Sequence, residues 1–302
     1  MLCAAVDIGS NTTRVLVAEP QDGQLRKVME QRAYTRFDKS SKRKNKVTAE
    51  KIAELADVVE TQVRLAQELG AEAIRIVATA AIRESKNARE AADEIARVAG
   101  VPVDLLSEEE EGRLAFLGAT KTLGHPVEGE IGVVDVGGGS SEIVLGSFDA
   151  GVRAVRSFRI GSGALADDFL TNDPPSPSEI RALRDRISDF FAEIEIDQPD
   201  QAVAVGGSAT SLRTLVGAVL EYETLERAVR VLSSDSITDV AKRFELDARR
   251  VKILPAGVLL LEKLSELLGQ PLQIGKGGLR EGIILDLLHN GASNGAPQAL
   301  AA

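Results

Sequence analysis

The stretch VDIGSN, residues 6–11, has a near copy much later in the chain, VDVGGGSSE at residues 134–142. Aligned without a gap, VDIGSNTTRVLV matches VDVGGGSSEIVL. In both copies an apolar run leads into an aspartate, a glycine-containing turn with hydroxyl side chains, and a second apolar run. This pattern predicts a β-hairpin that occurs twice, with turns whose backbone amides can hold an anion.

The bulk composition narrows the class of protein. A chain of 302 residues favours two domains of roughly 150 residues each. A net charge of −10 and only 3% aromatic residues oppose binding to nucleic acid or to an anionic membrane. The first residues do not read as a signal peptide, and no run approaches the ~20 apolar residues of a membrane span. We therefore expect a cytoplasmic protein with no nucleic-acid or membrane partner.

Strand-like and helix-like segments alternate along the chain, which predicts the α/β class. The repeated hairpin predicts two domains of related topology, with their turns facing each other across a cleft. We expect the N-terminal domain at residues 1–125 and the C-terminal domain at 126–278. The last helix, at about 279–290, would pack back on the first domain, and the polar tail at 291–302 would be disordered.

The two turns carry the first candidate site residues. Asp7 and Asp135 end apolar strands, where a lone carboxylate is costly to bury. A cation would relieve that cost, and oxygen ligands suit Mg²⁺. Tight hairpin turns that simply need glycine are the alternative, but an aspartate at the same offset in both copies favours phosphate binding. The candidate phosphate-binding residues of the turns are Ser10, Asn11, Thr12, Gly137, Gly138, Gly139, Ser140 and Ser141.

Two further segments could bind phosphate. The turn VGGSATSL, residues 205–212, follows a strand and opens a helix, whose N-terminus favours an anion. Arg83 follows the strand AIRIVATA at the end where α/β proteins bind ligands, and its guanidinium fork suits phosphate oxygens. A surface arginine paired with Glu84 or Glu90 is an equally good interpretation of Arg83.

The acidic run in LLSEEEEGRLAFLGA, residues 105–119, has a structural and a catalytic interpretation. Ser107 and Glu110 form a capping-box pattern, and acidic residues suit the positive end of a helix dipole. This explains residues 108–110 but says nothing particular about Glu111. A carboxylate at the helix start could orient and deprotonate a water molecule, but these residues alone do not select one of the four glutamates.

A basic stretch, RFDKSSKRKNK at residues 36–46, stands out in an acidic chain. Such stretches are usually only solvated. Beside a phosphate site, this one could guide a long polyanion.

Together these motifs resemble the exopolyphosphatase/guanosine pentaphosphate phosphohydrolase (Ppx/GppA) family, in its short form with two actin-like (ribonuclease H-like, ASKHA) domains and an interdomain active-site cleft. The resemblance runs from residue 4 to about 288. It is carried by VDIGSNTTRVLV, VATAAIRESKN, LSEEEEGRLAFLGA, VVDVGGGSSEIVLG, VGGSATSL, ILPAGVLLL and GGLREGIIL.

The resemblance implies a role for each candidate residue. Glu111 would be the catalytic base, and Asp135 and Glu142 would bind Mg²⁺ with Asp7 opposite them. Mn²⁺ is an alternative metal, and a monovalent cation such as K⁺ a further candidate. The implied reaction is processive hydrolysis of the terminal phosphate of inorganic polyphosphate by a homodimer. The implied phosphate contacts are Ser10, Asn11, Thr12, Arg83, the 137–141 turn, Gly207 and Ser208.

Three other functions stay open at this point. Hydrolysis of guanosine pentaphosphate (pppGpp) is the nearest, an actin-fold ATP-dependent phosphotransferase is another, and a polyphosphate sensor without turnover is the third. Two segments depart from the family pattern, namely the basic stretch and the segment GSGALADDF that begins at residue 161. We assign no site residue to that second segment.

Overall fold

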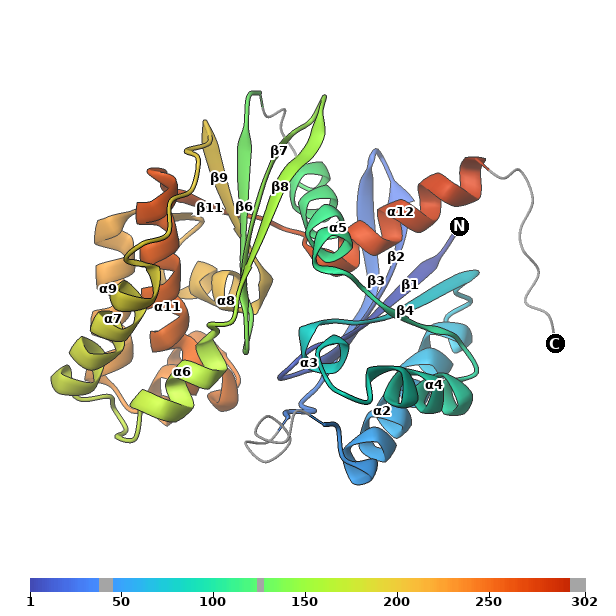
Figure 1. The fold of residues 1–302 in the computed structure, drawn as a ribbon, viewed down its shortest axis with the longest axis horizontal. Helices are drawn as coiled ribbons and strands as arrows, with labels where there is room; N and C mark the ends of the chain where they lie inside the picture. The colour runs from blue at the N-terminus through green and yellow to red at the C-terminus, as the bar shows by residue number, and fades with distance from the viewer. Residues whose placement is uncertain (38–45, 124–127, 294–302) are drawn as a thin grey trace. The chain divides into compact units, whose positions relative to one another are not determined.

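The computed structural model describes residues 1–37, 46–123 and 128–293 of the chain (Figure 1). The chain divides into two compact units. Unit 1 comprises residues 1–124 together with 277–302, and unit 2 comprises residues 125–276.

Two of the sequence predictions fall largely outside the described residues. Residues 38–45 of the basic stretch lie outside them, and so do residues 294–302 of the tail. What was expected of these segments stays a prediction. Within the described ranges, no helix has the length and apolar character that crossing a bilayer requires.

Unit 1 is built on a five-stranded mixed sheet. Its strands are β1 (Cys3–Ile8), β2 (Thr13–Gln21), β3 (Gln24–Ala33), β4 (Ala73–Ala78) and β5 (Val103–Leu105). Their order across the sheet is β3-β2-β1-β4-β5. β1 forms an antiparallel hairpin with β2 and pairs in parallel with β4 on its other side. Because a central strand is covered on both faces, the sequence of β1 is apolar except for its aspartate.

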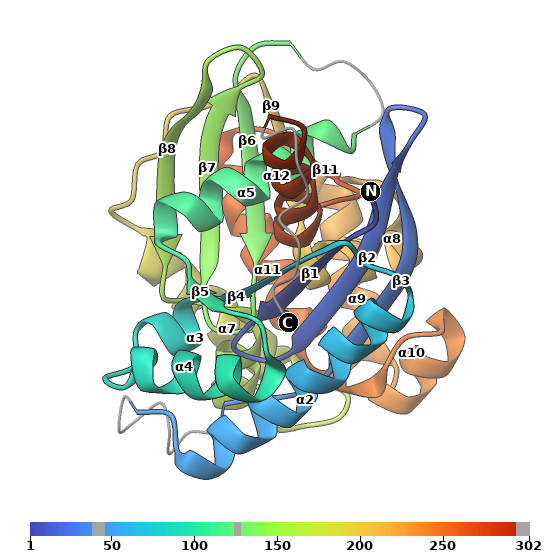
Figure 2. The same cartoon turned by 90° about the vertical axis from the view of Figure 1, so that its right-hand side faces the viewer.

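Helices cover both faces of this sheet (Figure 2). They are α2 (Ala49–Glu68), α3 (Ala80–Arg83), α4 (Ala88–Ala99), α5 (Glu108–Lys121) and α12 (Leu279–Ser293). Val6 lies in the core that α2 and α4 form with one face. Cys3 and Ala5 lie in the core that α5 and α12 form with the other. Because side chains alternate along a strand, Asp7 is on this second face.

Unit 2 repeats the plan with a six-stranded sheet. Its strands are β6 (Ile131–Val136), β7 (Ser141–Ser147), β8 (Gly151–Phe158), β9 (Gln201–Val205), β10 (Val219–Leu220) and β11 (Leu272–Ile274). Their order is β10-β11-β9-β6-β7-β8, so that β8-β7-β6-β9 corresponds to β3-β2-β1-β4. In both units the hairpin is antiparallel and the next strand is parallel. The predicted α/β class is confirmed, and the repeated sequence does form two hairpins.

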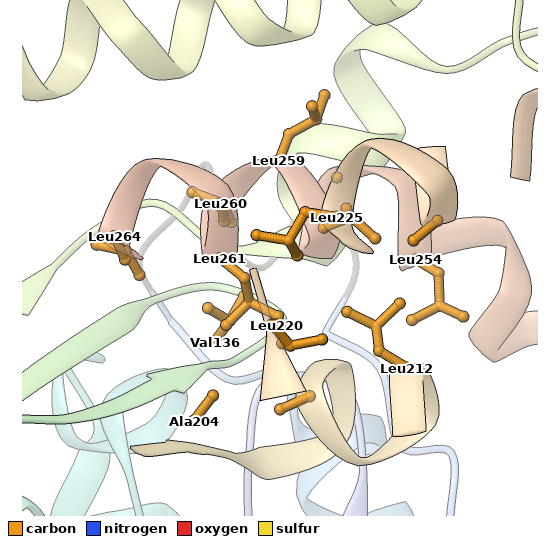
Figure 3. Packing of buried hydrophobic residues seen from close by; sticks show 14 of the residues in the cluster. Val136, Ala204, Leu212, Leu220, Leu225, Leu254, Leu259, Leu260, Leu261 and Leu264 are labelled. Carbon is orange, nitrogen blue, oxygen red and sulfur yellow. The ribbon is translucent and has the colours of Figure 1, made fainter. Parts of the chain in front are cut away.

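The core of unit 2 gathers around one long helix (Figure 3). The helices of this unit are α6 (Ser162–Phe169), α7 (Pro177–Phe191), α8 (Gly206–Val216), α9 (Tyr222–Ser234), α10 (Ile237–Phe244) and α11 (Ala248–Leu268). Leu261 of α11 lies in one cluster with Leu212 of α8 and Val136 of β6. Since Val136 and Ile143 belong to this core, the residues beside them, 135 and 142, project from the other face of the sheet.

In unit 1, α5 and α12 cross with their backbones in contact. A Cβ atom added at Gly118 of α5 would lie 1.9 Å from the carbonyl oxygen of Gly278. One added at Gly282 of α12 would lie 1.8 Å from the carbonyl oxygen of Leu114. The glycines therefore allow a helix separation that any side chain would prevent, and they fix where α12 lies on the sheet.

Replacing Gly118 by alanine tests this crossing. The added methyl group would overlap the backbone of α12, so we expect the free energy of unfolding to fall by about 3 kcal/mol. Glu60→Ala, at an exposed position of α2, is the control and should change it by less than about 0.5 kcal/mol. Denaturant unfolding measures both, and an unchanged midpoint for Gly118→Ala would contradict the close crossing.

Candidate active site

The second copy of the hairpin places two carboxylates next to each other. Asp135 of β6 stands directly opposite Glu142 of β7. Residues opposed in this way have their Cβ atoms about 4.5–5.5 Å apart. Two ionised carboxylates at this spacing repel each other, and a cation bound between their oxygens would remove the repulsion.

The start of α8 contacts the Asp135 carboxylate. Gly206 has φ of 78°, in the left-handed region, and follows directly after β9. A Cβ atom at Gly206 would lie 2.0 Å from Oδ1 of Asp135. Glycine is therefore required here both by the backbone conformation and by the closeness of the carboxylate.

The glycine turn beside Asp135 has its carbonyl groups held from one side. The Gly137 carbonyl accepts hydrogen bonds from the backbone N–H and the hydroxyl of Ser162, at 2.9 and 3.0 Å. The Gly138 carbonyl accepts one from the N–H of Ala164 at 3.0 Å. Because the C=O and N–H of a trans peptide point in opposite directions, the amides of Gly138 and Gly139 point away from the 162–164 segment. This is the arrangement of an anion-binding turn.

The supporting segment is the one to which the sequence analysis assigned no site residue. A Cβ atom at Gly161 would lie 2.5 Å from the backbone nitrogen of Gly139. One at Gly163 would lie 3.0 Å from the carbonyl oxygen of Gly138. The pair of glycines in GSGA was the available signal, because glycines spaced in this way mark a close approach of two backbones.

The third predicted turn carries a cation that the sequence analysis missed. The Arg250 guanidinium is buried, and a Cβ atom at Gly207 would lie 2.6 Å from its Nη2. A positive group at a helix N-terminus adds to the positive end of the helix dipole, so the turn suits an anion. The Ser208 hydroxyl donates to the Val136 carbonyl at 3.1 Å, and its phosphate-binding role stays a prediction.

The first copy of the hairpin has the same turn but different charges. The Gly9 N–H donates to the Thr12 carbonyl at 3.1 Å, just as the Gly137 N–H donates to Ser140 at 2.9 Å. Asp7, however, stands opposite Arg14, at the position that Glu142 occupies in the second copy.

Further charges surround Asp7 in unit 1. Burial raises the pKa of Asp7, although Arg280 and Arg14 act in the opposite direction. Arg280, at the start of α12, pairs with Glu30 of β3 at 2.9 Å, and Arg14 lies 3.9 Å from Glu30. Two acids and two arginines thus form one group, which we call the Asp7 cluster.

The two hairpins therefore differ in what they can bind. The second presents two acids at the opposed positions, and the first presents one acid and one base. A cation fits the second hairpin better, because Arg14 and Arg280 already lie near the single acid at the opposed positions of the first. The metal role of Asp7 and the phosphate contacts of Ser10, Asn11 and Thr12 stay predictions.

The donor set of the second hairpin fits Mg²⁺. Among the residues at 1–37, 46–123 and 128–293, no three His, Cys, Asp or Glu side chains gather as a potential metal site. Mg²⁺ does not need such a group, since it is commonly held by one or two carboxylates and completes its shell with water and phosphate oxygens. Asp135 and Glu142 would supply those carboxylates.

Arg83 and Glu111 meet in unit 1. The Arg83 Nη1 donates to Oε2 of Glu111 at 2.7 Å and to the Leu106 carbonyl at 2.9 Å. Its Nη2 lies 3.7 Å from Glu108. Both partners of the short pair are largely buried. The interpretation of Arg83 as a surface arginine paired with Glu84 or Glu90 is therefore replaced by an ion pair with Glu111.

The structure also distinguishes Glu111 from its neighbours. Ser107 accepts a hydrogen bond from the N–H of Glu110, as the capping pattern predicts. The Glu110 carboxylate is bound by both nitrogens of the Arg113 fork, at 2.8 and 2.9 Å. Glu109 is exposed. Glu108 is exposed as well, and Glu111 is thus the largely buried glutamate of the four, bound by Arg83 at 2.7 Å.

Comparison with known proteins gives one family. The model of the Ppx/GppA phosphatase family matches residues 16–291. Exopolyphosphatase 1 of Mycobacterium bovis is 28% identical, over 98% of this chain and 91% of its own. Guanosine-5'-triphosphate,3'-diphosphate pyrophosphatase of Vibrio vulnificus is 25% identical over 95% of this chain, which spans only 59% of that protein.

Solved structures agree with the family match. The crystal structure of the Aquifex aeolicus member of the Ppx/GppA family has a TM-score of 0.80 and 30% identity, over 96% of this chain and 98% of its own. An exopolyphosphatase from Cytophaga hutchinsonii has a TM-score of 0.81 at 18% identity, which shows the fold alone. The predicted two-domain actin-like fold is confirmed. The predicted cleft stays a prediction.

The charge of Glu30 in the Asp7 cluster should make stability depend on pH. Burial alone would raise the pKa of Glu30, but Arg280 and Lys27 outweigh it and lower the pKa from 4.5 to about 2. The ionised form therefore stabilises the fold above pH 4.5, and this contribution is lost as the pH falls toward 2.

We expect Glu30→Gln to lower the free energy of unfolding by about 1–2 kcal/mol at pH 7, a figure reduced for partial exposure. The difference from the wild type should shrink between pH 4.5 and pH 2. Glu54→Gln, in the exposed pair with Lys51, is the control and should have little effect. A Glu30→Gln difference that is absent at pH 7, or as large at pH 2.5, would contradict the cluster.

Proposed function

Because this chain belongs to the Ppx/GppA phosphatase family, we propose that it is an exopolyphosphatase that removes terminal phosphates from inorganic polyphosphate with Mg²⁺. The family makes the chain a phosphoanhydride hydrolase; the substrate, the metal and the base are the proposal. The observation that carries it is the opposed pair Asp135 and Glu142 beside the amides of Gly138 and Gly139. A cation site next to an anion site is what a metal-bound phosphate chain needs.

In unit 2, the chain's own groups would bind and orient the phosphates. The amides of the 138–139 turn would donate to oxygens of the terminal phosphoryl group, where negative charge develops during the reaction. Arg250 would supply positive charge at the third turn. When bound to Asp135 and Glu142, Mg²⁺ would neutralise phosphate oxygens as a Lewis acid.

In unit 1, Glu111 would accept a proton from the attacking water. The water oxygen forms a bond to the terminal phosphorus, and the bond to the bridging oxygen breaks. The products are inorganic phosphate and a polyphosphate chain one unit shorter. Arg83 holds the Glu111 carboxylate in place without substrate. A phosphate oxygen would compete for the same guanidinium, so that substrate binding weakens the ion pair and leaves Glu111 available to the water.

Two observations favour polyphosphate over pppGpp as the proposed substrate. The exopolyphosphatase relative aligns over nearly the whole of both chains, whereas this chain spans 59% of the pyrophosphatase. The basic residues at 36–46 would also suit a long polyanion more than a nucleotide. Hydrolysis of pppGpp stays the second candidate, since the guanosine-5'-triphosphate,3'-diphosphate pyrophosphatase of Vibrio vulnificus matches 95% of the chain. Cytoplasmic location, a homodimer, and Mn²⁺ or K⁺ as cofactors stay predictions.

Phosphate release across a ladder of polyphosphate lengths, with pppGpp and ATP in parallel, tests the proposal. We expect the wild type with Mg²⁺ to act on polyphosphate faster than on either nucleotide. Glu111→Gln should release phosphate about 10²–10⁴-fold more slowly, because the water loses its base, and should still bind polyphosphate. Glu109→Gln is the matched control in the same helical turn. Faster hydrolysis of pppGpp, or an unchanged rate for Glu111→Gln, would reverse the assignment.

Substitution of Arg83 tests whether its guanidinium is shared with the substrate. Lysine keeps the charge but loses the planar fork. We expect kcat/KM for polyphosphate to fall about 10–100-fold in Arg83→Lys, the equivalent of one or two charge-assisted hydrogen bonds. Most of the loss should be in KM. Arg89→Lys, on the exposed side of α4, is the control. Steady-state kinetics that give the Arg83 variant a wild-type KM would remove this role.

A further inference from the structure

A serine stands beside the two carboxylates of unit 2. Glu142 of β7 is opposed by Asp135 on one side and by Ser157 of β8 on the other. The Ser157 hydroxyl donates a hydrogen bond to Oε1 of Glu142 at 3.2 Å. Three side chains of one face of the sheet thus form a row across β6, β7 and β8.

Both carboxylates in this row are restrained from the outside. Gly206 brings the start of α8 against Oδ1 of Asp135. Ser157 holds one oxygen of Glu142 at the opposite end of the row. A glutamate side chain has several rotatable bonds, and fixing them when a cation binds costs conformational entropy. A hydrogen bond that already fixes one oxygen reduces that cost.

We propose that Ser157 is a positioning residue that holds Glu142 ready for the divalent cation. This inference rests on the proposed function, because it takes Asp135 and Glu142 as the metal-binding pair. The hydroxyl donates to Oε1 of Glu142 and so orients the carboxylate that would bind the cation. Ser157 would act through Glu142 and would not itself bind the metal or the substrate.

The backbone of β8 does not need a hydroxyl at this position. Ser157 is paired through its main chain within the β7–β8 ladder. The next residue, Phe158, packs against the core on the other face. The hydrogen bond to Glu142 is what distinguishes a serine here from a β-branched apolar residue, which would suit a strand better.

The test is direct binding of Mn²⁺ to the full chain without substrate, measured by electron paramagnetic resonance. Ser157→Thr keeps the hydroxyl. Ser157→Val introduces a side chain of the same shape as threonine but without the hydroxyl. We expect the Mn²⁺ dissociation constant to rise about 10–100-fold in the valine variant, as is usual when a group that supports a metal ligand is lost. The threonine variant should stay within about threefold of the wild type.

Two further variants serve as the negative and the positive control. Ser233→Ala removes a partly buried hydroxyl of the same unit that donates to the Val229 carbonyl, and it should not change Mn²⁺ binding. Glu142→Gln should weaken binding at least as much as Ser157→Val. The Mg²⁺ concentration for half-maximal phosphate release should rise in Ser157→Val by the same factor as the dissociation constant. The value of kcat at saturating Mg²⁺ should change little in this variant. A general loss of structure would instead lower kcat.

The outcomes separate this inference from the proposed function. If Glu142→Gln weakens Mn²⁺ binding but both Ser157 variants bind like the wild type, the role of Ser157 is wrong and the metal site stands. If Glu142→Gln binds like the wild type, both the metal site and the role of Ser157 are wrong. The expected Mn²⁺ pattern without hydrolysis of polyphosphate would support Ser157 and contradict the proposed substrate.

Discussion

A carboxylate at the end of a central strand is the constraint from which the rest of the site follows. Asp7 and Asp135 occupy the same place in two copies of one hairpin, and neither can be buried there without compensation. In the first copy, Arg14 across the hairpin and Arg280 of the terminal helix act against the rise in the pKa of Asp7 that burial causes. The second copy has an acid, Glu142, where the first has Arg14, which makes it the better candidate for a cation. One hairpin plan therefore gives two electrostatic environments.

In unit 1, the packing of two helices positions both the candidate base and an arginine near Asp7. The glycine crossing of α5 and α12 fixes two helices at once. One of them begins with the turn that carries Glu111, and the other begins with the arginine that faces Asp7. In unit 2 the corresponding support is local, because the glycines at 161 and 163 let a second backbone donate hydrogen bonds to the 137–139 turn.

Much of the fold could be predicted because its signals are local. The repeated hairpin, the capped start of α5 and the glycine turns each follow from a short stretch of sequence. Other features depend on contacts between distant segments. Arg250 is next to Gly207 only because α11 packs on α8, and Ser157 meets Glu142 only through the strand register. Pro255 lies inside α11, which begins at Ala248, because burial of the helix outweighs the hydrogen bond that the proline removes.

Diffraction data collected at the manganese absorption edge, from crystals grown with Mn²⁺ and phosphate, test the division between the two hairpins most directly. We expect an anomalous peak bound by Asp135 and Glu142. A peak coordinated by Asp7 while the carboxylates of Asp135 and Glu142 hold no ion would contradict it.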